Sequence, residues 1–251
     1  MLAARWRLSP NFIPLAAVFL VSGGLLYTGA LYAKIGVFVF VTAGWIVSLC
    51  LHEAAHAWAA WYGGDRSVLG KGYLSLDPLV YAHRDLSFVM PILFLMLGGI
   101  GLPGGAVYID TSALRSRGWD SFVSLAGPLA NIACFVLFAM PFLFGLPDWG
   151  GAPLFWYGLA FLVALQISAV LLNLLPLPGL DGFGILRPFL PHALQQQARA
   201  FGPALSFLLL FLFMLPEFSR PFWGIVASLA NAFGVSAMEI SYGIHLFRFW
   251  Q

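Results

Sequence analysis

Residues 35–62 read IGVFVFVTAGWIVSLCLHEAAHAWAAWY, an apolar run interrupted near its end by His52, Glu53 and His56. A helix needs about 20 residues to cross the ~30 Å hydrocarbon core of a bilayer, so this run predicts a membrane-spanning helix. Ionisable side chains are costly at that depth and are retained mainly for function. The structural alternative is a buried polar cluster that only ties helices together.

The sequence His52-Glu53-Ala54-Ala55-His56 fits the pattern H-E-x-x-H. Residues four apart lie on one face of a helix, so both imidazoles can bind one zinc ion. Glu53 then lies beside the metal-bound water and can act as general base. The pattern therefore predicts a zinc site with Glu53 as the catalytic residue.

The composition fits a protein whose solvent is largely lipid. Hydrophobic residues make up 61% of the 251 residues, charged residues make up 9%, and mean hydropathy is +0.90, against roughly 25% charged residues in a soluble domain. We expect one membrane-embedded domain over residues 1–251, with its core at about 35–190. A net charge of +2 does not suggest nucleic acid as a partner. Cys50 and Cys134 lie in apolar runs and are read as buried thiols, not as a disulfide.

The apolar runs predict an all-α polytopic membrane protein with about six transmembrane helices. Their expected ranges are Phe12–Ala33, Ile35–Tyr62, Phe122–Gly145, Leu154–Leu175, Ala204–Leu215 and Phe222–Val235. Phe88–Leu102 is shorter and rich in glycine, and is expected to be re-entrant. Val68–Leu76 is expected to form a small membrane-associated β-hairpin, to which Ala106–Ile109 adds a strand.

Charge placement orients these elements. With Phe88–Leu102 re-entrant and the N-terminus in the cytoplasm, only Lys34 and Arg220 of the twelve Lys and Arg residues fall outside. This distribution obeys the positive-inside rule. The same topology makes the helix before Asp181 run in the same direction as the His52–His56 helix. We therefore expect a multi-pass protein of a prokaryotic inner membrane with a cytoplasmic N-terminus.

Asp181 is the best candidate for a third zinc ligand, since catalytic zinc sites usually have three protein ligands. It follows Pro176, Pro178 and Gly179 within a run of membrane depth. Irregular backbone at that depth is tolerated where it lines a cavity. The other carboxylates lie in connecting segments, at helix starts or near the C-terminus.

Three segments together resemble the site-2 protease family of intramembrane zinc metalloproteases. They are His52-Glu53-Ala54-Ala55-His56, Ala126-Gly127-Pro128-Leu129-Ala130-Asn131, and Asn173-x-x-Pro176-x-Pro178-x-Leu180-Asp181-Gly182. The resemblance covers residues 51–182. The sequence shows no PDZ-like or cystathionine-synthase-like module, which other members of the family carry. It implies zinc held by His52, His56 and Asp181, catalysis by Glu53, and cleavage in or near a transmembrane helix of a protein or peptide substrate.

Other polar residues are open to two interpretations. Asn173 could hold an extended substrate backbone or stabilise the oxyanion, or could only bond a neighbouring helix. His83 could donate to the oxyanion or be an interfacial histidine without a special role. Asn131 is expected to serve helix packing.

Substrate binding and the class of function also have alternatives. An extended substrate could add as a strand to Leu76–Tyr81 or to the segment near Ala106. The competing class of function is a zinc-binding membrane protein or transporter without proteolysis. It would share intramembrane histidines and an acid, but it would not require Glu53.

Overall fold

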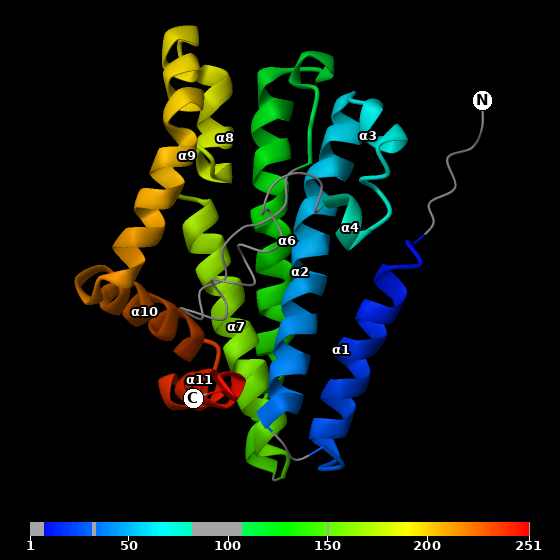
Figure 1. The fold of residues 1–251 in the computed structure, drawn as a ribbon, viewed down its shortest axis with the longest axis vertical. Coiled ribbons are helices and arrows are strands. Elements are labelled where there is room, and N and C mark those ends of the chain that lie inside the picture. The colour runs from blue at the N-terminus through cyan, green and yellow to red at the C-terminus, as the bar shows by residue number, and fades with distance from the viewer. Residues whose placement is uncertain (1–7, 32–33, 82–106, 150, 251) are drawn as a thin grey trace.

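The structure is a computed structural model that describes residues 8–31, 34–81, 107–149 and 151–250 (Figure 1). Within these residues every regular element is a helix. The elements are α1 (Phe12–Tyr27), α2 (Lys34–Gly63), α3 (Ser67–Gly70), α4 (Pro78–Tyr81), η1 (Thr111–Ala113), α6 (Arg117–Leu143), η2 (Leu146–Trp149), α7 (Pro153–Asn173), α8 (Asp181–Leu186), η3 (Arg187–Phe189), α9 (His192–Met214), α10 (Pro216–Asn231) and α11 (Ala237–Phe247).

The centre of the molecule is formed by α2, α6 and α7, which pack side by side. Helices α2 and α7 run in the same direction, and α6 runs in the opposite direction (Figure 1). The parallel course of α2 and α7 agrees with the direction expected for the two helices that lead to His56 and Asp181. Asp181 begins α8, at the same end of the bundle as the C-terminal part of α2 (Figure 1).

The hydrophobic core lies along α7. Seven consecutive residues of this helix, from Leu159 to Leu165, are at most 5% exposed. Phe40 and Trp45 of α2 and Phe138 of α6 belong to the same core. A helix that is apolar on every side buries all its faces, so α7 fits the middle of a bundle.

The predicted spans are confirmed in part. Among the described residues, three helices are long and apolar enough to cross a membrane: α2, α6 and α7. They coincide with three of the six predicted runs. Helix α1 is apolar but has only 16 residues. The two C-terminal runs fall largely in α9 and α10, and neither of these helices is among the three.

The predicted β-hairpin is wrong. Ser67–Gly70 is helix α3, residues 71–75 form turns and a bend, and Pro78–Tyr81 is helix α4. No strand is assigned in residues 107–109. The partial alternation of apolar and polar residues in Val68–Leu76 does not produce strand pairing, because the hydrogen bonds of this segment are local. One example joins the Tyr73 N–H to the Val68 carbonyl (3.2 Å). The Phe88–Leu102 segment lies outside the described residues.

Candidate metal centre

His52 and His56 lie one turn apart on the buried face of α2, with 3% and 6% of their surface exposed. Their Nε2 atoms are 3.0 Å apart. The Nδ1 atom of His56 lies 2.7 Å from the carbonyl oxygen of Val123, and that of His52 contacts Oδ1 of Asn131. Carbonyl oxygens only accept, so both Nδ1 atoms donate, and in the neutral imidazole this leaves the lone pair on Nε2. Bonds of this kind orient the histidine ligands of metal sites.

Gly127 of α6 lets that helix approach the two imidazoles. A Cβ atom at this position would lie 2.3 Å from Nε2 of His56 and 2.6 Å from Nε2 of His52. Contacts of that length are repulsive, so only glycine fits here. Small residues allow membrane helices to pack closely, and here the close approach also forms one wall of the histidine site.

Asp181 is positioned by the break between α7 and α8. Helix α7 ends at Asn173, an irregular stretch with Pro176 and Pro178 follows, and α8 begins at Asp181. The next residue, Gly182, packs against the end of α7, where an added Cβ would lie 2.3 Å from the Leu174 carbonyl oxygen. This tight packing fixes the start of α8 and with it the direction of the Asp181 side chain.

Helix α8 and the turn after it are docked on α6. Arg187 Nη2 lies 2.7 Å from Oδ1 of Asp120, in the first turn of α6. Next to it on α6, the Ser121 hydroxyl donates to the carbonyl oxygen of Ile185. These two contacts hold the Asp181 element against the helix that also contacts His52 and His56.

The Asp181 carboxylate faces both histidines. Its Oδ2 is 3.3 Å from Nε2 of His52, and its Oδ1 is 3.4 Å from Nε2 of His56. One ligand atom from each of the three residues lies within 4.8 Å of the others. The residues thus come together as the sequence predicts, from α2 and from the start of α8.

The three side chains fit a divalent cation. Two neutral imidazoles whose Nε2 lone pairs face each other cannot hydrogen-bond to one another. Oδ2 of Asp181 is buried and has no hydrogen-bond partner among the described residues. A cation between the three groups would satisfy all of these acceptors. Two imidazole nitrogens and one carboxylate form a common ligand set of catalytic zinc.

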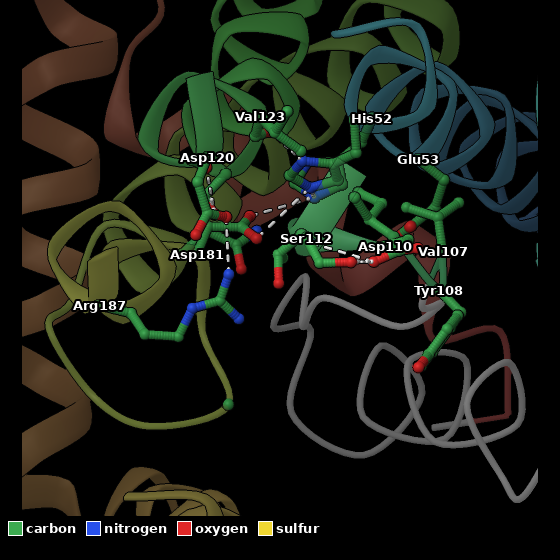
Figure 2. A pocket seen from close by; sticks show the side chains of 16 residues that line it. His52, Glu53, Val107, Tyr108, Asp110, Ser112, Asp120, Val123, Asp181 and Arg187 are labelled. Carbon is green, nitrogen blue, oxygen red and sulfur yellow. Dashed lines mark hydrogen bonds and ion pairs between the residues drawn. The ribbon is translucent and has the colours of Figure 1, made fainter. Parts of the chain in front are cut away.

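A cavity of about 550 Å³ opens onto the three side chains. Figure 2 shows Asp181 and Arg187 on one side of it and the segment from Val107 to Ser112 on the other. Glu53 lines the same cavity and is 3% exposed. Glu53, the residue after His52 on α2, thus lines the same cavity as the three candidate ligands.

The remaining predicted residues have different outcomes. Asn173 lines the cavity, is 2% exposed, and its Oδ1 has no partner among the described residues. His83 lies outside them. Cys50 and Cys134 are buried free thiols, as expected. Asn131, for which the sequence favoured a packing role, contacts His52 directly.

Sequence reasoning missed Gln166 of α7. It is fully buried, and its Oε1 accepts a hydrogen bond from Nδ2 of Asn131 (2.8 Å). The one available signal was an uncharged polar residue in the middle of an otherwise apolar membrane helix, where such residues tend to bond across helices.

Comparison with known proteins finds bacterial relatives over nearly the whole chain. A protein of Mycolicibacterium smegmatis named "Putative zinc metalloprotease Rip2" is 44% identical over 255 residues, which cover 98% of this chain and 95% of the relative. The protein of the same name from Mycobacterium tuberculosis H37Rv is 44% identical over 253 residues, with the same coverage. "Putative zinc metalloprotease YwhC" of Bacillus subtilis is 30% identical over 77% of this chain and 88% of its own length. No family model and no solved structure matches the chain.

Proposed function

Because the chain belongs to the site-2 protease family of zinc metalloproteases, we propose that it hydrolyses peptide bonds in or near transmembrane segments of other membrane proteins. The observation that carries the proposal is the meeting of His52, His56 and Asp181 at a cavity that Glu53 also lines, inside a bundle of apolar helices. In this proposal Nε2 of both histidines and the Asp181 carboxylate would hold a zinc ion.

Bound there, zinc would supply a Lewis acid that polarises the scissile carbonyl and makes a water molecule more acidic. Glu53 accepts a proton from a water molecule as the water oxygen bonds to the carbonyl carbon. Glu53 then delivers the proton to the amide nitrogen as the carbon–nitrogen bond breaks, which leaves a carboxyl and an amine product. Glu53 is 3% exposed, which shields its carboxylate from bulk water.

Substrate positioning falls to the polar lining of the cavity. A transmembrane helix has its amides bonded internally, so the cleaved segment must unwind and find new partners. Oδ1 of Asn173, which has no partner among the described residues, is an acceptor for a substrate N–H at the end of α7 that leads to Asp181. The segment Val107–Asp110 lines the opposite side and can lie along an extended substrate.

We also propose the cellular setting. The chain is a single-domain, multi-pass protein of a prokaryotic inner membrane with its N-terminus in the cytoplasm. The support is the three long apolar helices, the bacterial relatives, and the bias of lysine and arginine to one side. The histidines lie near the C-terminal part of α2, which this orientation puts towards the cytoplasm.

The test is the purified full chain in detergent, with Glu53→Gln compared with wild type. Zinc per chain is measured by elemental analysis, and cleavage is measured on single-span membrane substrates. Glu53→Gln removes the base and keeps the side-chain size, so we expect wild-type zinc content and a loss of cleavage of at least about 100-fold, within the usual effect of a general base.

The matched control is Glu217→Gln, the same change at an exposed residue of α10, which should leave both quantities unchanged. Equal cleavage by wild type and Glu53→Gln would overturn the assignment of the base. Zinc-loaded wild type that cleaves no membrane substrate would favour the transporter or another zinc-binding protein instead.

A further inference from the structure

A buried chain of polar side chains runs from the metal centre into the bundle. His52 of α2 contacts Oδ1 of Asn131 of α6, and Nδ2 of Asn131 donates to Oε1 of Gln166 of α7 (2.8 Å). The three residues are 3%, 3% and 0% exposed. Three helices are thus joined through side chains that solvent does not reach.

The orientation of the Asn131 amide decides which ring nitrogen of His52 is free to bind a metal ion. Asn131 has an accepting end and a donating end. With Oδ1 towards His52, the imidazole donates from Nδ1, and its Nε2 lone pair points at Asp181 and His56. With the amide reversed, the hydrogen of His52 would sit on Nε2, which could not bind a metal ion.

Gln166 provides the contact that favours the first arrangement. Its Oε1 is the acceptor for the Asn131 amide group. Without an acceptor at that point, turning Nδ2 towards Gln166 would bury an unpaired donor, which costs about 1–3 kcal/mol. Within the described residues Nε2 of Gln166 has no partner, so the hydrogen bond with Asn131 is the polar contact that this side chain makes.

We propose that Gln166 is a positioning residue for the zinc site, which acts by orienting the Asn131 amide so that His52 presents Nε2 to the metal. This inference rests on the proposed function, since it takes zinc as the ligand of His52. It adds α7 to α2, α6 and α8 as a helix that sets the metal affinity, although Gln166 is not itself one of the three ligands.

The first experiment measures the zinc dissociation constant of the full chain in detergent by chelator competition, together with the unfolding temperature. Gln166→Met keeps the volume and removes the strong acceptor. We expect about tenfold weaker zinc binding, at the lower end of the effects seen for partners of metal-bound histidines. Gln166→Glu retains an acceptor at the same reach and should restore most of the affinity.

The control is Ser168→Ala, also on α7 and fully buried, whose hydroxyl donates to the Leu165 carbonyl (2.8 Å) within the same helix. It should leave zinc affinity unchanged. If Gln166→Met and Ser168→Ala lowered affinity equally, or if Gln166→Met bound zinc as tightly as wild type, the positioning role would be wrong.

The second experiment repeats Gln166→Met in an Asn131→Asp background. Both oxygens of the introduced carboxylate accept, so this side chain cannot present a donor to His52, and the effect of Gln166→Met on zinc affinity should disappear. A purely structural effect of Gln166 would instead add to that of Asn131→Asp. Zinc-loaded wild type without protease activity would refute the proposed function alone, because the zinc affinities of the variants would still decide the role of Gln166.

Discussion

Gly127→Ala is the most informative single change in this protein, because one methyl group would enter the metal centre. The new Cβ would lie 2.3 Å from Nε2 of His56 and 2.6 Å from Nε2 of His52, whereas ordinary contacts of a Cβ begin at 3.4 Å. The imidazoles would have to move by about 1 Å, and metal–ligand distances tolerate only about 0.2 Å.

The expected loss of zinc affinity is therefore at least about 100-fold, or about 2.8 kcal/mol at 1.4 kcal/mol for each factor of ten. The fold should survive, since alanine is favoured over glycine inside a helix by about 0.5–1 kcal/mol. Zinc affinity by chelator competition, read together with the unfolding temperature of the metal-free protein, separates the two effects.

Gly118→Ala is the matched control on the same helix. Among the described residues its Cβ would meet only Oγ of Ser116, at 3.7 Å, so zinc affinity should not change. The steric reasoning would be refuted if Gly127→Ala bound zinc with the affinity of wild type while Gly118→Ala behaved as expected. The same result would also argue that the two histidines do not bind the metal through the Nε2 atoms that face Gly127.

Two further changes test the elements around the site. Gly182→Ala would bring a Cβ to 2.3 Å from the Leu174 carbonyl oxygen, which is backbone and cannot turn away. We expect the metal-free protein to unfold at a lower temperature and zinc binding to weaken. Gly224→Ala should change neither, because no atom of the described residues lies within 4 Å of the Cβ it would add. At Asp77, burial raises the pKa of the carboxyl group. The hydrogen bonds it accepts, the strongest from Ser9, lower the pKa by a larger amount, so the pKa lies below 3.8. The ionised Asp77 carboxylate therefore stabilises the fold above pH 3.8, and this stabilisation is lost as the pH falls further. Asp77→Asn should unfold at a lower temperature than wild type at neutral pH, and the difference should shrink in acid. A difference independent of pH would contradict this.

The candidate ligands could be chosen from the sequence, because two of them are close in sequence and the third lies at a break that prolines impose on the backbone. His52 and His56 share a helix face by spacing alone. Asp181 could be chosen because Pro176 and Pro178 require a break at membrane depth, and the break exposes the one carboxylate there. The structure brings these residues within 4.8 Å.

The β-hairpin could not be judged from sequence because strand pairing depends on a partner, and alternation in a short segment does not supply one. Leu76 adopts a positive φ of 60°, and Asp77 then accepts hydrogen bonds from Ser9 and from the Leu79 N–H. The segment is thus tied to the chain before α1 by side-chain contacts 68 residues apart, which no local pattern reveals.

The role of Asn131 could not be settled from the sequence, and the reason is physical. An asparagine in a membrane helix will bond to something, and composition suggests another helix, which gives the packing role that the sequence favoured. Whether that helix carries a ligand depends on which face α6 turns to α2, and the close approach of Gly127, one turn from Asn131, to both imidazoles puts this face against the histidines. Packing and metal positioning are therefore the same contact, so a change at Asn131 that preserved the bundle should still alter zinc affinity.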